Sequence, residues 1–163
     1  MTNNVKPVPE GYHTLTPMVI FKDSRQAIEF YKKAFGAQER SCMMWPDGTG
    51  VMHAEIQIGD SRLMMGDEKS GQPCKSAQTL GNSPVTFYFY SPDADAAFKK
   101  AVAAGAAVQM PVQDAFWGDR WGSVTDPFGH TWAIATHKRD VPLEEMRKAA
   151  EAACAQMAQT AKK

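Results

Sequence analysis

The chain has 163 residues, of which 44% are hydrophobic, and its 18 Lys and Arg residues balance 18 Asp and Glu residues. This length suffices for one domain with a substantial core, or for two small modules that share one. Because the chain carries no net positive charge, we expect a small molecule or a protein as its partner, and neither nucleic acid nor membrane. No apolar run approaches the roughly 20 residues that span a bilayer, and the first residues lack the apolar core of a signal peptide, which predicts a cytoplasmic protein.

The first half of the chain is predicted to form a β-α-β-β-β module. A lead-in over residues 1–12 contains Pro7, Pro9 and Gly11, and an apolar strand follows at residues 14–21. Residues 24–35 have apolar side chains at helical spacing and predict an amphipathic helix. Three strands separated by turns complete the module, at residues 38–45, 51–58 and 62–66.

The second half repeats this order. The first helix ends before Gly36-Ala37 and a second helix, at residues 92–104, ends before Gly105-Ala106, an offset of 105 − 36 = 69 residues. The strands of this module are predicted at residues 84–91, 107–112, 121–125 and 130–137. Between the modules lies a polar linker that is long enough to close over a site.

A tail helix is predicted to begin near Pro142, because Glu144 and Glu145 suit the positive end of a helix dipole. Its apolar residues fall at spacings of three and four, which requires burial against the modules or against a second subunit. These residues are Leu143, Met146, Ala150, Ala153 and Met157. The predicted organisation within one globular domain is a lead-in (1–12), a first module (13–67), a linker (68–83), a second module (84–137) and a C-terminal helix (140–160).

The cysteines predict neither a disulfide framework nor a zinc site. Cys42, Cys74 and Cys154 are odd in number, lie far apart and form no Cys-x-x-Cys motif. We expect them to be reduced, with Cys42 and Cys154 acting as small hydrophobic side chains.

Several segments of both halves resemble the vicinal oxygen chelate superfamily, which contains glyoxalase I, extradiol dioxygenases, and fosfomycin- and bleomycin-resistance proteins. Among them are Ala27-Ile-Glu-Phe-Tyr-Lys-Lys-Ala-Phe-Gly-Ala37, His53-Ala-Glu-Ile-Gln-Ile-Gly-Asp60 and Asp126-Pro-Phe-Gly-His-Thr-Trp132. The similarity extends over nearly all of residues 14–137 and is greatest to the PhnB-like branch. The resemblance implies an α+β fold of two β-α-β-β-β modules, whose mixed sheets form a half-open cup with helices on the outer faces. It implies function inside the cup, although one fold supports many chemistries.

Metal-using members of this family take ligands from the first and last strands of each module. Strand alternation assigns these positions here to Thr16, Met64, Thr86 and Ala133. Two hydroxyls, a thioether and a methyl group do not replace the imidazole, carboxylate or thiolate ligands of a transition metal. The sequence therefore predicts no metal and no other cofactor.

Two histidine positions remain as candidates for chemistry. His53 and Glu55 are two residues apart on a strand and share one face, so they could act as a base and its orienting group, or form a polar sheet surface. His130 follows a turn and shares its face with Trp132, which favours packing or a turn hydrogen bond. His13 and His137 lie at strand ends, where we expect them to be solvated.

The segment Phe116-Trp-Gly-Asp-Arg-Trp121 is a candidate lip of the cup. The ring of Trp117 and the guanidinium of Arg120 suit a planar or anionic ligand. Alternatively, Asp119 and Arg120 pair with each other while Trp117 and Trp121 close the end of the barrel. The predicted ligand-binding residues are Thr16, Met18, Met64, Thr86, Tyr88, Tyr90, Trp117, Arg120 and Ala133.

The function favoured by the sequence is metal-independent binding of a small aromatic or anionic molecule in the cup. One alternative is a lyase or isomerase of the same superfamily that uses His53 and Glu55, or a metal at unusual positions. Another is an interaction protein that docks through its tail helix. The sequence leaves open whether the chain is an enzyme. We expect a homodimer, because a second copy can cover the sheet edges that a half-open cup leaves exposed.

Overall fold

A computed structural model describes residues 5–160 of the chain, with side chains to residue 153. In the first module, β1 runs parallel to β4 and the other neighbouring strands are antiparallel, in the order β1-β4-β3-β2. Its elements are β1 (Met18–Phe21), α1 (Ser24–Phe35), β2 (Gln38–Met44), β3 (Val51–Ile58) and β4 (Ser61–Asp67).

The second module has the same topology. Its sheet has the order β5-β8-β7-β6, with β5 parallel to β8. Its elements are β5 (Thr86–Tyr90), α3 (Ala94–Ala103), β6 (Ala107–Asp114), β7 (Asp119–Thr125) and β8 (Thr131–His137). The predicted fold class is confirmed: the protein is α+β, with two four-stranded mixed sheets that do not close into a barrel.

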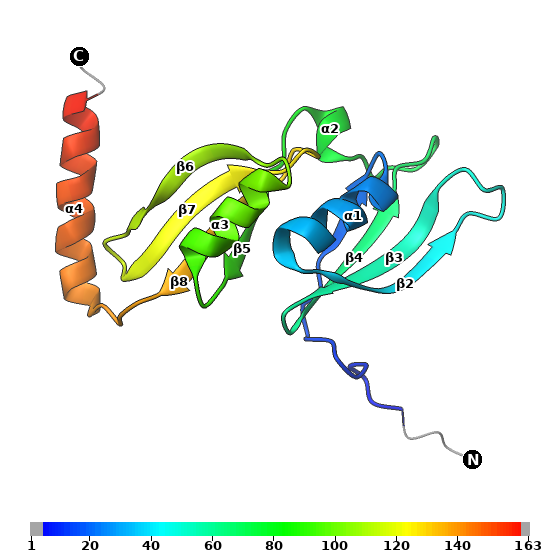
Figure 1. The fold of residues 1–163 in the computed structure, drawn as a ribbon, viewed down its shortest axis with the longest axis horizontal. Helices are drawn as coiled ribbons and strands as arrows, with labels where there is room; N and C mark the ends of the chain where they lie inside the picture. Colours follow the sequence, from blue (N-terminus) through cyan, green and yellow to red (C-terminus); the bar gives the residue numbers. More distant parts are fainter. Residues whose placement is uncertain (1–4, 161–163) are drawn as a thin grey trace.

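The two helices of the modules pack against each other on the same side of the two sheets (Figure 1). Among residues 5–160, no helix covers the opposite face of either sheet. We call these the open faces of the first and second sheets. Strand alternation therefore sends one set of side chains into the helix-covered core and the other set to the open faces.

Helix α1 has its predicted bounds, whereas α3 runs from Ala94 to Ala103 and is shorter than the predicted 92–104. Asp23 and Asp93 are their N-caps, and each carboxylate accepts a hydrogen bond from the backbone N–H three residues later. Gly36 ends α1 in the left-handed conformation, at a φ of 68°, which favours glycine at that position.

The structure differs from the sequence prediction at several boundaries, among them the starts of β1 and β7. Strand β1 is shorter than predicted and begins at Met18, after Pro17, which has no N–H to donate to a ladder. Strand β7 begins at Asp119, two residues earlier than predicted. The linker contains a short helix, α2 (Ala77–Leu80), whose N-terminus is capped by Ser76.

The modules are joined through an aromatic core. Phe128, in the turn between β7 and β8, packs edge-on against Phe21, Phe30 and Tyr31 of the first module, at ring-centroid distances of 5.7, 5.8 and 6.2 Å. All four side chains are buried. Edge-to-face packing of this kind contributes beyond the burial of apolar area.

The buried carboxylate of Asp126 completes this junction. Its Oδ2 atom accepts hydrogen bonds from the Tyr31 hydroxyl at 2.6 Å and from Trp132 Nε1 at 3.0 Å. Its Oδ1 atom accepts from the backbone N–H groups of Phe128 and His130, each at 2.9 Å. One carboxylate therefore shapes the turn of the second module and binds the helix of the first.

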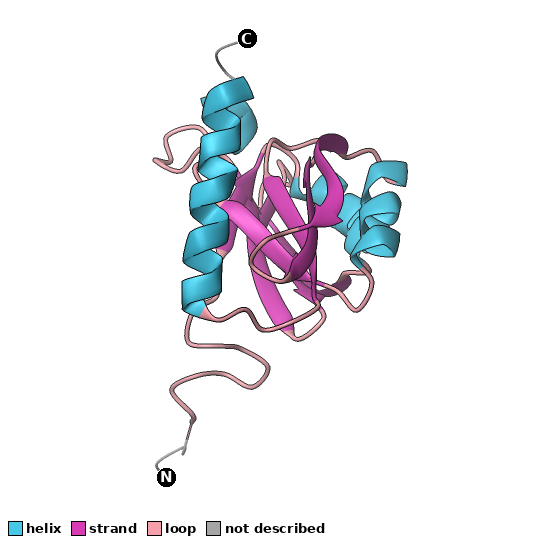
Figure 2. Cartoon of the chain, turned by 90° about the vertical axis from the view of Figure 1, so that its left-hand side faces the viewer, coloured by secondary structure: helices cyan, strands magenta, loops and turns pink. Residues whose placement is uncertain are grey.

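The tail helix α4 (Leu143–Thr160) stands beside the second module in two views (Figures 1 and 2). Leu143 is 71% exposed, and Met146, Ala150 and Ala153 are partly exposed, whereas the side chain of Met157 lies outside the described residues, as does that of Cys154. Arg139 and Glu145 form an ion pair at the start of the helix. In the part of the chain that the structure describes, no helix is long and apolar enough to cross a membrane.

We predict that Tyr31→Phe lowers the free energy of unfolding by about 1.5–3 kcal/mol, because it leaves a buried carboxylate without one of its donors. Denaturant unfolding measures the change. Tyr90→Phe is the matched control, since it removes a hydroxyl from a carboxylate at a residue that is 60% exposed. A loss in Tyr31→Phe no larger than in Tyr90→Phe would contradict the role of this bond.

Candidate ligand site

The open face of the second sheet carries two exposed tyrosines. Tyr88 and Tyr90 of β5 are 47% and 60% exposed, and their ring centroids are 5.1 Å apart. In register beside them on β8 lie Ala133 and Ala135, whose side chains are buried. Small residues on β8 leave room for the tyrosine rings to lie over the sheet, so a broad aromatic surface faces solvent.

A buried carboxylate holds these tyrosines in place. Asp119, the first residue of β7, is 3% exposed. Its Oδ2 atom accepts hydrogen bonds from the hydroxyls of Tyr88 and Tyr90, each at 3.2 Å, and from Trp117 Nε1 at 3.1 Å. We call Tyr88, Tyr90 and Trp117 the aromatic platform. Because three donors converge on one oxygen, their orientations depend on one another.

His137 binds the other oxygen of the same carboxylate. It lies opposite Asp119 in the register of β7 and β8, and its Nδ1 is 2.9 Å from Asp119 Oδ1. Its Nε2 is 3.2 Å from Asp140, which is fully exposed. The hydrogen bond to Asp119, followed by that to Asp140, raises the pKa of His137. The two carboxylates thus hold a half-exposed imidazole at the edge of the platform.

The electrostatics of the platform follow from burial and hydrogen bonding. Burial alone would raise the pKa of Asp119, but hydrogen bonds from His137, Tyr90, Trp117 and Tyr88 outweigh it and lower the pKa. Burial, together with the Asp119 charge, raises the pKa of Tyr88 to about 12 and also raises that of Tyr90. Both tyrosines are therefore neutral hydrogen-bond donors at pH 7.

Arg120 does not belong to this surface. It follows Asp119 on the strand and so points to the opposite face, where its guanidinium binds Asp95 of α3 at 2.7 and 2.9 Å and Asp114 at 3.3 Å. The hydrogen bonds that it donates to Asp95 raise the pKa of Arg120. The prediction that Arg120 and Trp117 form one lip is wrong, because the strand begins at Asp119 and separates the two side chains. The alternative pairing of Asp119 with Arg120 is also wrong.

The open face of the first sheet carries the pair His53 and Glu55. Their side chains are bonded at 3.2 Å, as Nε2 to Oε1. The other carboxylate oxygen of Glu55 accepts hydrogen bonds from the Tyr12 hydroxyl and from Arg62, the latter at 3.3 Å. The hydrogen bond from Tyr12 lowers the pKa of Glu55, although burial acts in the opposite direction. Both oxygens of Glu55 are thus engaged within the chain.

The positions that correspond to metal ligands in the family do not suit a metal. Met64 lies in register with Met18, and Ala133 lies in register with Tyr88. The Thr16 hydroxyl donates to the carbonyl of His13. Thr86 lies on the edge strand β5, beside Thr131. Among the described side chains, no group of three or more His, Cys, Asp and Glu could hold a metal ion.

Strand alternation brings together only part of the predicted site. Tyr88, Tyr90, Trp117 and Ala133 share the open face of the second sheet, whereas Met18 and Met64 lie on the first sheet. Sequence reasoning missed Asp119 and His137 as the centre of the cluster, and Tyr12 as a partner of Glu55. The register of the hairpin formed by β7 and β8 pairs Asp119 with His137. The sequence prediction began β7 at Trp121 and so left Asp119 outside the strand.

Comparison with known proteins identifies the family. Residues 13–134 match the model of the Glyoxalase/Bleomycin resistance protein/Dioxygenase superfamily. The chain belongs to this superfamily. An uncharacterized protein of Mycobacterium tuberculosis, Rv0887c, is 37% identical over 152 residues, which cover 91% of this chain and 85% of that protein.

Solved structures of the same fold include relatives from plants and bacteria. The structure of the Arabidopsis thaliana gene product At5g48480 superimposes with a TM-score of 0.61 and 34% identity, covering 76% of this chain and 98% of that one. A PhnB protein from Bacillus cereus has a TM-score of 0.60 and 18% identity, with 76% and 99% of the two chains covered. At this identity the PhnB protein shows a shared fold alone.

We predict that His137 titrates above the ordinary histidine pKa of about 6.5, and that Asp119→Asn lowers its pKa by more than Asp140→Asn does. Titration by NMR measures both changes. Because the folded-state pKa is raised, the contribution of His137 to stability is complete below about pH 6.5 and is lost as the pH rises through the folded-state value. A larger effect of Asp140→Asn would contradict the assignment of Asp119 as the main partner.

Proposed function

We propose that the protein binds a small planar aromatic molecule on the aromatic platform, without a metal or other cofactor, in the cytoplasm. The observation that supports this proposal is the convergence of Tyr88, Tyr90 and Trp117 on the buried carboxylate of Asp119. A pre-oriented aromatic surface loses little conformational entropy when a ring stacks on it.

The charge distribution favours an aromatic ligand over an anionic one. The nearest carboxylate, Asp119, is negative, and Arg120, the cation expected to attract an anion, binds Asp95 on the other face. The hydroxyl oxygens of Tyr88 and Tyr90 retain lone pairs that can accept a hydrogen bond from a ligand N–H or O–H. A neutral ring with a polar hydrogen suits this surface best.

Catalysis by His53 and Glu55 receives less support from the geometry. A carboxylate that acts as a general base needs a free oxygen within reach of the substrate. Both oxygens of Glu55 are engaged by Tyr12, His53 and Arg62. This arrangement is typical of a polar cluster that stabilises a sheet surface.

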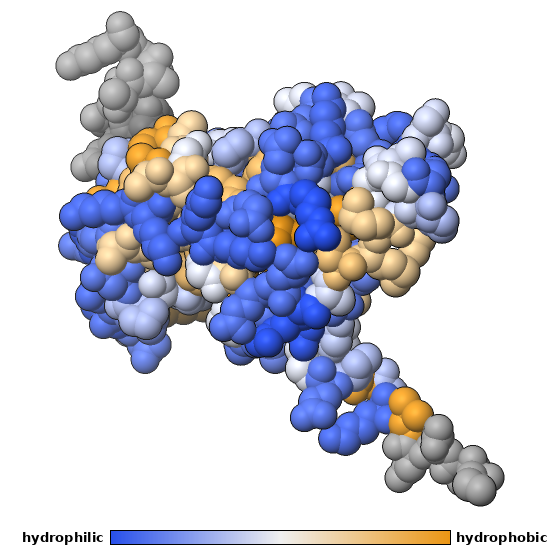
Figure 3. Space-filling model, turned by 45° about the vertical axis from the view of Figure 1, so that its right-hand side comes forward, coloured by the Kyte–Doolittle hydropathy of each residue, from blue (hydrophilic) through white to orange (hydrophobic). Residues whose placement is uncertain are grey.

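We also propose that the protein is a homodimer in which a second copy packs on exposed apolar side chains of the open faces and leaves the aromatic platform free. Both open faces carry such side chains outside the platform, among them Met18, Met43 and Met110. Large apolar side chains exposed on one face are typical of interfaces. By contrast, polar side chains predominate on the face shown in Figure 3. The net charge of zero does not oppose self-association.

Titration with indole, followed by NMR, tests the proposed ligand class. We expect Tyr88→Leu to weaken binding by about 2- to 12-fold, the equivalent of losing one aromatic contact. Indole should bind more tightly than cyclohexanol, which cannot stack, and treatment with a chelator should leave its affinity unchanged. Equal affinity for indole and cyclohexanol, or loss of binding after chelation, would contradict the proposal.

Two further variants make this test specific. Arg25→Ala, on the exposed surface of α1, is the control and should leave indole affinity unchanged. Arg120→Ala distinguishes the platform from the lip predicted from the sequence. If Arg120→Ala weakens indole binding as much as Tyr88→Leu does, at an unchanged melting temperature, the ligand lies elsewhere.

Light scattering tests the dimer. We expect the full chain to be a dimer at micromolar concentration, because each open face exposes apolar area. If the interface lies on the sheets, a chain that ends at Arg139 should also be a dimer. Met43→Asp, on the edge strand β2 of the first sheet, should weaken the dimer. A monomeric full-length protein refutes the dimer, and a dimer lost only upon truncation assigns the interface to α4.

A further inference from the structure

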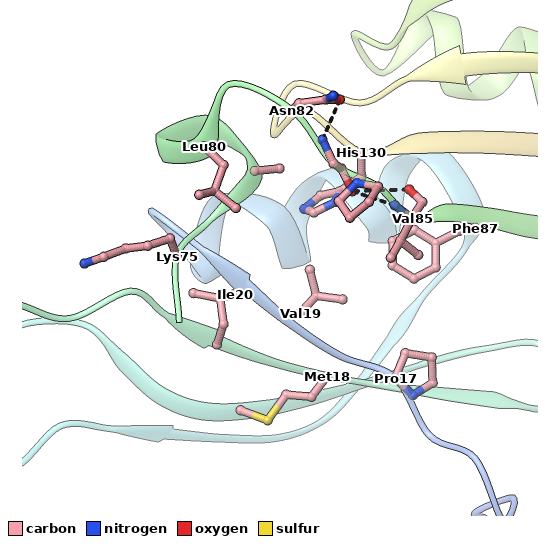
Figure 4. A pocket seen from close by; sticks show the side chains of 13 residues that line it. Pro17, Met18, Val19, Ile20, Lys75, Leu80, Asn82, Val85, Phe87 and His130 are labelled. Atoms are coloured by element: carbon pink, nitrogen blue, oxygen red, sulfur yellow. Dashed lines mark hydrogen bonds between the residues drawn. The ribbon is translucent and has the colours of Figure 1, made fainter. Parts of the chain in front are cut away.

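A hollow lies at the junction between the two modules, apart from the aromatic platform. It has a volume of about 270 Å³ and lies between β1, β5 and the segment that contains α2. Figure 4 shows Val19 and Ile20 of β1, Leu80 of α2, and Phe87 of β5 around it. The helix in the linker therefore forms one wall of a cavity, and we call this hollow the junction pocket.

The junction pocket contains a buried histidine whose ring has no partner. His130 is 6% exposed, and neither of its ring nitrogens has a hydrogen-bond partner among the described residues. Its ring packs edge-on against Phe21 and Phe87, at centroid distances of 5.3 and 5.9 Å. Its backbone is bonded to Asp126, through the His130 N–H to the carboxylate and through the His130 carbonyl, which accepts from the Asp126 N–H at 2.9 Å. Burying a polar group without a hydrogen-bond partner costs free energy, so we expect these two nitrogens to bond to a ligand or to a water molecule.

The imidazole of His130 is neutral at pH 7. Burial lowers its pKa, although the charge of Asp126 acts in the opposite direction. A neutral imidazole offers one N–H donor and one bare nitrogen acceptor. It can therefore exchange a hydrogen bond with an uncharged group, but it supplies no positive charge for an anion.

The remaining walls of the pocket are mainly apolar. Val19, Ile20, Leu80, Val85 and Phe87 surround the histidine. Lys75 also borders the pocket, but its amine extends away from the other labelled side chains (Figure 4). An apolar cavity of about 150 Å³ accommodates benzene, so this pocket has room for a substituted benzene ring.

From this geometry we propose that the junction pocket is a second binding site, which takes a small neutral molecule with an apolar body and one hydroxyl group, as in a phenol. The hydroxyl exchanges a hydrogen bond with a ring nitrogen of His130, and the apolar body fills the space between β1, β5 and α2. His130 approaches the pocket from the helix side, where Phe21 and Phe87 contact its ring, and none of the platform residues lines the pocket, so this site is separate from the proposed platform.

Titration of the full chain with p-cresol, compared with toluene and benzoate, tests the junction pocket. NMR reports the shifts of the His130 ring nitrogens and the dissociation constants. We expect p-cresol to shift the His130 signals and to bind at least about fivefold more tightly than toluene, because the hydroxyl satisfies a buried nitrogen. Benzoate should bind more weakly than p-cresol. A dissociation constant for p-cresol weaker than about 10 mM would overturn the proposal.

Variants separate the two sites. His130→Phe keeps a ring of similar shape and should abolish the preference for p-cresol over toluene. Val85→Trp, at a residue that is 52% exposed, should block the pocket without disturbing the core. Tyr88→Leu should leave the His130 shifts intact, even if it weakens binding to the platform. If Tyr88→Leu abolishes p-cresol binding while His130→Phe and Val85→Trp do not, the junction pocket is not a site.

Discussion

The carboxylate of Asp126 is the constraint on which the arrangement of the two modules depends. Buried at the turn between β7 and β8, it accepts four hydrogen bonds, one of them from Tyr31 of the other module. Because those donors fix the turn, Phe128 is inserted among the aromatic rings of the first module. The same turn directs His130 into the junction pocket. A single charged group thus connects module packing to the formation of a cavity.

A second buried carboxylate, Asp119, has a comparable role on the open face. Asp126 binds groups that are themselves buried, whereas Asp119 holds Tyr88 and Tyr90, which remain half exposed. The difference matters for function. The groups that donate to Asp126 are buried and stabilise the fold. The tyrosines that donate to Asp119 are held in a fixed orientation with their rings exposed to solvent. The cost of burying each charge is offset by several charge-assisted hydrogen bonds.

Local patterns in the sequence predicted the elements well, because their signals are local. Helix α1 has the predicted bounds, and alternation correctly directed Trp132 to the helices and Tyr88 to the opposite face. The failures concern relations between distant residues. The sequence prediction began β7 at Trp121, two residues too late, and so placed Arg120 in the loop beside Trp117. Because β7 begins at Asp119, Arg120 belongs to the strand and its side chain points to the helix side. The junction pocket depends on how two modules meet, which no single segment encodes.

The bond between Tyr31 and Asp126 also makes the two halves of the repeat unlike. Helix α3 contains no tyrosine, and the turn of the first hairpin carries Asp60, whose side chain is 88% exposed. The helix of the first module therefore bonds to the β7–β8 turn of the second module, and no equivalent bond joins α3 to the turn between β3 and β4. A chain made of two first modules would bring the donor without the buried acceptor, and a chain of two second modules would bring the acceptor without the donor. Chemical divergence of the two halves thus favours the pairing of a first module with a second one, even though their topology is the same.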